Sequence, residues 1–261
     1  MGTTRFSGPL MYSGAGGDSL GFGTWFRNLP LQCNPDYVVK WDDFTGVDID
    51  DTDDWTKSVL NSGTMTLLAD HVGGWAKSTG DGSTDNSGGA IQGNEIFMIA
   101  SSKKIFFEAT VAVADADDMD MFVGLAENGS FATGVPFTAN NQIGFLLVEG
   151  AADIYANCDL GSSQTLTDTG IDFADGAESG STITNTRRLG FVVTGTGTVE
   201  FYVDRVKKVT TTTTTSIPTS ALTPWFAAMS GTTTADAAWC DYSMVAAQRV
   251  TDGMVEYDDQ P

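Results

Sequence analysis

The chain has 261 residues, of which 30 are glycine, and its 34 acidic against 13 basic side chains give a formal charge of −21. This charge argues against nucleic acids and anionic membranes as partners, because binding to phosphate groups depends on Lys and Arg side chains. A chain of this length can bury one large core, and the scarcity of Leu, Lys and Glu disfavours long helices.

The N-terminal segment, residues 1–36, combines glycine and small polar residues with aromatic residues that follow no period. Disordered segments are usually poor in aromatic residues, so we expect an extended arm that docks on its own body or on a neighbouring subunit, with a disordered leader as the alternative. Residues 37–261 would then form the folded domain. The candidate anchoring residues of the arm are Phe6, Tyr12, Phe22, Trp25 and Phe26.

The start of the chain lacks the apolar core of a signal peptide, and no window of about 18 apolar residues predicts a membrane span. We therefore expect synthesis and folding in a cytosol. The three cysteines, Cys33, Cys158 and Cys240, are widely spaced and form neither a disulfide framework nor a zinc motif, so we expect reduced and mostly buried thiols.

From residue 37 onward, alternation of residue type with period two predicts about a dozen strands separated by glycine-rich turns. The clearest region spans 103–127, where two strands joined by an acidic turn predict an antiparallel hairpin. The apolar run 141–149 is typical of a strand buried on both faces and should pair with 153–158, and 188–194 should form a hairpin with 198–204. Further strands are expected at 37–41, 63–70, 71–77, 90–99, 164–173, 206–212, 225–229 and 238–249.

These elements predict an all-β protein, an antiparallel β-sandwich in one domain. The hairpins exclude an all-parallel sheet, and the chain shows no repeat of fixed period, which argues against a propeller or a solenoid. The threonine run 210–215 is expected in an exposed edge strand, because threonine has good β-propensity.

Several stretches resemble the concanavalin-A-like (lectin/glucanase) jelly-roll superfamily over about residues 37–249. The resemblance implies a jelly-roll β-sandwich and speaks for fold more than for function. It rests on Asp42-Asp43-Phe44 followed by Trp55, on IFFEATVAV (105–113), FVGLAE (122–127), NQIGFLLVEG (141–150) and RRLGFVVTGTGTVEFYVDRV (187–206), and on Asp241-Tyr242 in the closing strand.

The opening residues, GTTRFSGPL at 2–10, resemble the starts of tailed-phage virion proteins that are encoded near capsid genes. Decoration (cement) proteins are among them. Together with a jelly roll and an aromatic arm, this resemblance implies a structural protein associated with a phage capsid.

Catalytic residues are not expected. The glucanases of the superfamily carry a Glu-x-Asp-x-Glu or Glu-x-Asp-x-x-Glu strand, which places two carboxylates about 5 Å apart for retaining hydrolysis. The strand judged analogous here holds only Glu108, and the other glutamates Glu95, Glu127 and Glu149 lie on different elements. The single histidine, His71, has no GxSxG setting and is interpreted as an ordinary loop residue.

Acidic loops could supply oxygen ligands to Ca²⁺, although none matches the EF-hand spacing, and solvated loops are the alternative interpretation. The candidate ligands are Asp48, Asp50, Asp51, Asp53 and Asp54, then Asp115, Asp117, Asp118 and Asp120, and finally Asp81, Asp85 and Asn86. Within these clusters, Asp48, Asp50, Asp115 and Asp117 are the metal candidates retained.

Four tryptophans could stack on sugars as in a lectin, but burial in the core is the commoner fate of such residues. They are Trp55, Trp75, Trp225 and Trp239.

We therefore predict a non-enzymatic structural protein of a phage virion, which decorates and stabilises the capsid shell after assembly in the host cytoplasm. Its partners would be the major capsid protein and sister subunits in a homo-oligomer, for which a trimer is one symmetry. No nucleic acid, membrane or cofactor is expected, apart from Ca²⁺. The alternative is a carbohydrate-binding module or adhesin on a tail or fibre, and a glycan hydrolase or lyase ranks third.

Overall fold

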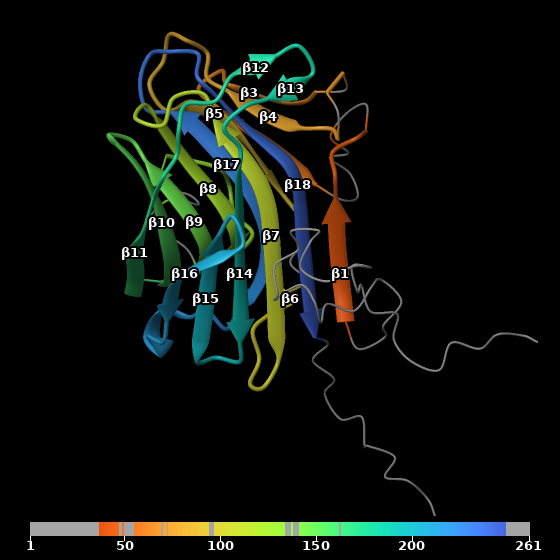
Figure 1. Cartoon of the computed structure of the whole chain (residues 1–261), viewed down its shortest axis with the longest axis vertical. Helices are drawn as coiled ribbons and strands as arrows, with labels where there is room; N and C mark the ends of the chain where they lie inside the picture. Colours follow the sequence, from red (N-terminus) through yellow and green to blue (C-terminus); the bar gives the residue numbers. More distant parts are fainter. Residues whose placement is uncertain are drawn as a thin grey trace, which may run out of the picture.

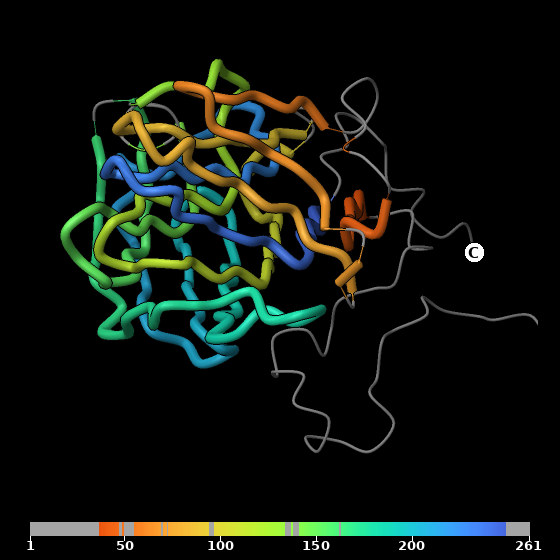
Figure 2. The backbone as a smooth tube through the Cα atoms, turned by 90° about the horizontal axis from the view of Figure 1, so that it is seen from above, coloured from red at the N-terminus to blue at the C-terminus, as the bar shows by residue number. Residues whose placement is uncertain are grey.

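The protein is an antiparallel β-sandwich in which two large sheets pack face to face (Figure 1). The structure is a computed structural model that describes residues 37–46, 49, 55–68, 70–71, 73–93, 97–133, 137, 141–161 and 163–248. The first and last described strands pair with each other, with Tyr37 opposite Gln248, so the described chain begins and ends on the same side of the molecule (Figure 2). Among these residues, no helix is long and apolar enough to cross a membrane.

One sheet contains eight strands, all paired antiparallel, and we call it the β7 sheet. Its main path is β16 (Val206–Thr211), β15 (Thr198–Val203), β14 (Arg187–Thr194), β7 (Lys104–Val113), β18 (Ala237–Gln248), β4 (Ala76–Thr79) and β3 (Thr64–Leu67), with β1 (Tyr37–Asp42) also paired to β18.

The other sheet also has eight strands, and we call it the β9 sheet. Its path is β11 (Ser163–Asp172), β10 (Ala151–Leu160), β9 (Gln142–Val148), β8 (Met119–Ala126), β17 (Ala221–Ser230), β5 (Ser87–Gln92) and β2 (Thr56–Leu60), with β6 (Phe97–Met98) paired to β17. A separate two-stranded hairpin, β12 (Glu178–Ser179) with β13 (Thr182–Ile183), lies at the top of the molecule in Figure 1.

Aromatic rings connect the two sheets through the core. Phe107 of β7 stacks on Phe191 of β14, with ring centroids 4.9 Å apart, and Phe191 contacts Phe201 of β15. Phe201 meets Phe145 of the β9 sheet edge to face at 5.4 Å. All four rings are fully buried, because alternation along each strand points them between the sheets.

The predicted hairpin at 103–127 is wrong, although both of its strands exist. β7 pairs with β14 and β18, whereas β8 pairs with β9 and β17 in the opposite sheet. The acidic segment 114–118 therefore crosses from one sheet to the other. Both strands are buried on both faces, so each occupies a central position in its own sheet, and a short polar connection does not distinguish a hairpin from such a crossing.

Most other predicted elements are confirmed, including the pairing of β9 with β10 and the three-strand meander β14–β15–β16. The strand predicted at 71–77 is wrong, since β4 begins only at Ala76 and Gly73 and Gly74 adopt φ values of +93° and +74°. The short strand β2 was not predicted. The threonine run is strand only to Thr211 of the edge strand β16, and a 3₁₀ turn follows at Thr214–Ser216.

The four packed rings that connect the sheets give a first testable prediction. Replacing Phe191 with Ala removes a fully buried ring that contacts two other rings, and we expect it to lower the free energy of unfolding by about 3–5 kcal/mol. Chemical denaturation measures this change. The matched control is Val206→Ala at a side chain that is 57% exposed, where the change should stay within about 0.5 kcal/mol. Equal effects of the two variants would contradict the assigned core.

Candidate functional site

The outer face of the β9 sheet carries two rows of side chains that neighbouring strands bring together. Residues paired across antiparallel strands point to the same side of the sheet, so register alone defines the rows. The first row reads Gln164, Asp159, Gln142, Ala126 and Thr223 from β11 to β17. The second row reads Leu166, Asn157, Gly144, Gly124, Trp225 and Gln92 from β11 to β5.

Polar atoms in these rows are buried without hydrogen-bond partners. They include both amide atoms of Gln142, Nδ2 of Asn157, Oδ1 of Asp159 and Nε1 of Trp225. All four residues are at most 2% exposed. An unpaired buried polar group costs about 1–3 kcal/mol, so a concentration of such groups on one face of a sheet indicates a surface kept for a ligand.

Two facing glycines lie in the middle of the second row. A Cβ added to Gly124 would lie 2.5 Å from Cα of Gly144 and 2.3 Å from the carbonyl oxygen of Ile143, so no larger residue fits there. The glycine pair lies between Asn157 on one side and Trp225 on the other, and the Phe122 ring covers Gly144, where an added Cβ would lie 2.9 Å from Cε2 of that ring.

An aromatic group lies beside the rows. Phe131 and Phe137, which follow β8, pack with Phe122, Leu146 and Trp225 in one apolar cluster. The segment before Phe131 is held by a reciprocal pair of hydrogen bonds: Nε2 of Gln92 donates to the carbonyl of Gly129 at 2.9 Å, and the Gly129 amide donates to Oε1 of Gln92 at 3.2 Å. The face thus combines apolar rings with a few convergent polar groups, as small-molecule sites do.

Asp159 is the carboxylate within the two rows. Its side chain stands opposite Gln142, and burial raises its pKa above the ordinary value. On the same face, Asp168 lies opposite Tyr155, four residues from Asp159 along the ladder and hence roughly 13 Å away. A group of this kind can hold a proton and donate it to a ligand oxygen.

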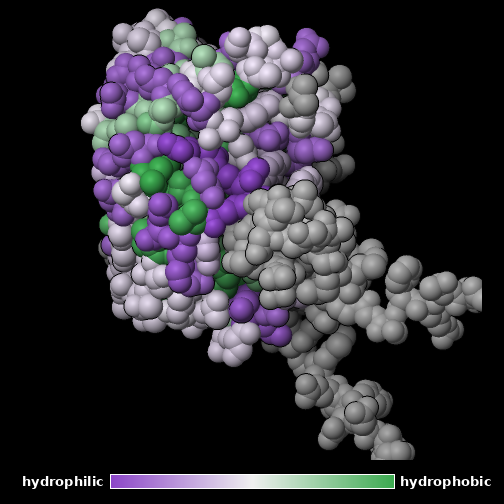
Figure 3. Space-filling view, in the orientation of Figure 1, coloured by the Kyte–Doolittle hydropathy of each residue, from purple (hydrophilic) through white to green (hydrophobic). Residues whose placement is uncertain are grey.

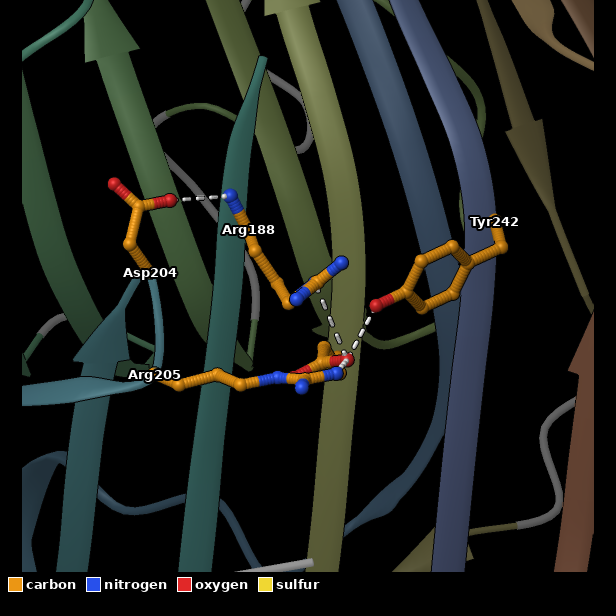
Figure 4. A network of polar contacts seen from close by, with 5 residues as sticks. Arg188, Asp204, Arg205 and Tyr242 are labelled. Carbon is orange, nitrogen blue, oxygen red and sulfur yellow. Dashed lines mark hydrogen bonds and ion pairs between the residues drawn. The ribbon is translucent and has the colours of Figure 1, made fainter. Parts of the chain in front are cut away.

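The outer face of the β7 sheet holds a second polar cluster, which includes Arg188, Arg205 and Tyr242 (Figure 4). Glu108, 2% exposed, accepts a hydrogen bond from the Tyr242 hydroxyl and lies 3.4 Å from Nη2 of Arg205. Nε of Arg188 is 3.7 Å from the same carboxylate. Burial raises the pKa of Glu108, while Tyr242 and the two arginines oppose that rise. Glu108 is therefore a buried, hydrogen-bonded residue on a strand.

The predicted anchoring residues of the arm and the metal candidates Asp48 and Asp50 lie outside the described residues. Asp115 and Asp117 are described, and the Asp117 amide donates to Oδ1 of Asp115 at 3.0 Å. In the described part of the chain, no three His, Cys, Asp or Glu side chains are grouped so that they could hold a metal ion. Ca²⁺ binding therefore stays a prediction, as do the capsid partner, the oligomer and the virion location.

The other single residues behave mostly as expected. Trp55, Trp75, Trp225 and Trp239 are all buried, as are the thiols Cys158 and Cys240, which are free. Burial raises the pKa of Cys158 to about 12, so this thiol is unreactive at neutral pH. His71 lies in a loop, as expected, although its side chain is only 6% exposed and its Nε2 lies 3.6 Å from Glu178.

No family model and no curated protein sequence matches the chain. Solved structures do match. A β-glucanase from Bacillus licheniformis aligns with a TM-score of 0.55 and 13% identity, over 79% of this chain and 97% of its own. A glycoside hydrolase family 16 endo-glucanase from Bacteroides ovatus has a TM-score of 0.53 and 13% identity, over 79% and 99%. Peanut lectin has a TM-score of 0.54 and 11% identity, over 83% and 99%.

At these identities the likeness establishes the fold, which is the concanavalin-A-like jelly roll that the sequence resemblance implied. The resemblance to phage decoration proteins finds no support among these structures.

The prediction that the protein is not an enzyme is contradicted by these neighbours. Glucanases predominate among them, a lichenase and a laminarinase included. The prediction relied on the absence of a Glu-x-Asp-x-Glu strand. That reasoning was too narrow, because register brings side chains from different strands into one row, as it does for Asp159 and Gln142.

Sequence reasoning missed the polar residues of the β9 sheet and the exposed Trp41. A usable signal existed for the former: Gln142 begins the otherwise apolar strand β9, and Asn157 and Asp159 alternate with the buried residues Ala156 and Cys158 in β10. What the sequence did not show is that Gln142 shares a face with Asn157 and Asp159, because that depends on the register between β9 and β10.

Asp241 provides a test of the electrostatics on the outer face of the β7 sheet. It lies where the register of β18 shifts, and burial raises its pKa from 3.8 to about 6, with Asp43 adding to the rise and Arg188 opposing it. The folded state therefore binds this proton more tightly than the unfolded chain. The associated stability is present below about pH 4 and is lost as the pH rises through about 6.

We expect Asp241→Asn to match the wild type in unfolding free energy at pH 4 and to exceed it at pH 8. The full pKa rise would correspond to ~3 kcal/mol, and solvent screening of this half-buried group reduces the expected gain to about 1 kcal/mol. Urea denaturation across this pH range gives the difference. The exposed Asp117→Asn, which removes the same charge, should follow the wild type at both pH values. A constant offset for Asp241→Asn would contradict the assigned pKa.

Proposed function

We propose that this protein binds a neutral glycan on the outer face of the β9 sheet. The observation that carries the proposal is the set of buried, unpaired hydrogen-bonding atoms on Gln142, Asn157, Asp159 and Trp225. Amides, a carboxylate and an indole N–H together offer the donors and acceptors that sugar hydroxyls require. A neutral chain fits because the two rows contain no Lys or Arg, and the protein as a whole is strongly acidic.

The arrangement suggests how a sugar would be held. The aromatic cluster around Phe131 supplies an apolar wall. The Phe122 ring fills the space over Gly144, so it would have to turn aside to admit a sugar ring between Asn157 and Trp225. In the ligand-free chain these polar atoms are covered, so binding requires the covering side chains to move. Gln164 is a natural point of entry, because it is exposed on the edge strand β11 and donates a hydrogen bond to Oδ1 of Asn157 at 3.0 Å.

Binding can be tested with the neutral β-glucan oligosaccharides named for the neighbouring structures, within a broader neutral glycan array. Trp225→Phe keeps an aromatic ring but removes the N–H donor, and Asn157→Ala removes an amide. Each should weaken binding by about tenfold or more, as expected when a buried donor to a ligand is lost. Isothermal titration of the full chain provides the affinities.

The matched control is Trp239→Phe, an equally buried tryptophan on the other sheet, which should leave affinity unchanged. Absence of binding to every neutral glycan would overturn the proposal. So would an equal loss in the Trp225 and Trp239 variants, because it would trace the effect to general destabilisation.

Hydrolysis is a second candidate, favoured by the buried Asp159. A carboxyl with a raised pKa can donate its proton to the oxygen of a glycosidic bond as the bond to the anomeric carbon breaks, while a second carboxylate attacks that carbon or activates water. The two carboxylates must lie within about 10 Å of each other. Asp168 is too far away by register, so the second carboxylate would have to come from outside the two rows.

If the protein is a hydrolase, Asp159→Asn should lower the release of reducing ends from mixed-linkage β-glucan by at least about 100-fold while leaving binding of the intact chain measurable. Asp168→Asn, on the same face, is the control and should retain activity. Equal turnover by wild type and Asp159→Asn would exclude Asp159 as the acid, and binding without turnover by the wild type would leave the glycan-binding proposal standing alone.

A further inference from the structure

The outer face of the β7 sheet is built so that one arginine reaches across a neighbouring strand. Asp204 and Arg205 have φ values of +49° and +64° and form the tight turn between β15 and β16. This is the backbone of the two-residue turn that suits a twisted hairpin. Gly190 of β14 stands opposite Glu108 and carries no side chain, and Arg205 crosses β14 to reach Glu108 (Figure 4).

The carboxylates nearest to Arg188 already accept hydrogen bonds from other groups, so none pairs with the Arg188 guanidinium alone. Glu108 already accepts from Tyr242 and Arg205. The Asp204 carboxylate accepts from Nη1 of Arg187 and from the backbone amide of Arg188, both at 3.0 Å.

The Arg188 guanidinium contacts Glu108 only through Nε at 3.7 Å, and that Nε has no hydrogen-bond partner. The Arg188 side chain is 39% exposed. Asp241 is near enough to feel its charge, but no hydrogen bond joins them.

An exposed tryptophan ring lies next to this cluster. Trp41 of β1 is 53% exposed, and it stacks on Tyr242 with ring centroids 5.4 Å apart and planes 2° from parallel. Tyr242 in turn is held by its hydrogen bond to Glu108. The indole is therefore fixed in orientation, although about half of its surface faces solvent.

Charge distribution distinguishes this face from the rest of an acidic chain. The basic residues Arg188, Arg205 and Lys207 gather on this face, where they outnumber the acidic partners Glu108 and Glu200. Figure 3, in the same orientation as Figure 1, shows strongly hydrophilic residues across the middle of this face.

We propose that this face is a second binding site, separate from the β9 sheet, for an acidic saccharide unit. The sugar ring packs on the exposed indole of Trp41, and the carboxylate of the sugar pairs with the guanidinium of Arg188. Tyr242 connects the two groups, because it stacks on Trp41 and donates a hydrogen bond to Glu108, which Arg188 also contacts, so a unit with one ring and one charge matches the arrangement. An extended acidic peptide fits less well, because this face offers side chains and not a free strand edge for main-chain hydrogen bonds.

The probes are a tetramer of galacturonic acid and its fully methyl-esterified form, which keeps the backbone and loses the charge. Titration of the full chain should show binding of the acid and at least tenfold weaker binding of the ester. Arg188→Gln and Trp41→Ala should each weaken binding of the acid at least tenfold. Lys207→Gln removes a cation on the same sheet, 52% exposed and paired with Glu200, and should change affinity less than twofold.

Several outcomes would overturn the proposal. They are absence of binding of the acid, equal binding of the ester, an effect of Lys207→Gln as large as that of Arg188→Gln, and equal binding of a tetrapeptide of aspartate. Arg188→Lys tests whether a loss of affinity comes from misfolding. It keeps the charge and should therefore keep more affinity than Arg188→Gln. Trp225→Phe should leave this binding unchanged, so the two sites are tested independently.

Discussion

The structure depends on one packing constraint, which is that two large sheets share a single buried layer. The rings of Phe107, Phe191, Phe201 and Phe145 run through that layer from β7 to β9 and hold the sheets in register with each other. Because alternate side chains of each strand point into this layer, the remaining side chains must point outward. Both candidate sites are consequences of this division, because each lies on the outer face of one sheet.

The two outer faces differ in which of their buried polar side chains have hydrogen-bond partners. On the β7 sheet, the buried carboxylate of Glu108 accepts a hydrogen bond from Tyr242 and forms an ion pair with Arg205. Arg188 makes only a longer contact with the same carboxylate. On the β9 sheet, Gln142 and Asp159 stay unpaired. A folded chain tolerates such unpaired groups only at a cost, and a ligand is the simplest source of the missing partners. Unpaired atoms also occur on the outer face of the β7 sheet, at Oγ1 of Thr110, Nε of Arg188 and Nε1 of Trp239, but the β9 sheet holds more of them in two adjacent rows, which favours it as the main site.

The glucanases and the lectin share the fold of this chain, and one fold supports both cleavage and binding, so the likeness does not choose between them. That choice depends on whether a second carboxylate approaches Asp159. It is a question about side chains from different strands, which a linear motif does not answer.

The sequence by itself determined the fold class, most of the strands and the meander from Arg187 to Thr211, because period-two alternation and turn residues are local signals. It also indicated that Glu108 was isolated within its strand. The tertiary structure decided what depends on pairing between distant strands. It placed β7 and β8 in opposite sheets, aligned Asp159 with Gln142, and carried Arg205 across Gly190 to Glu108. The physical reason is that alternation assigns each side chain to a face of its strand, whereas only register and sheet order determine which side chains meet there.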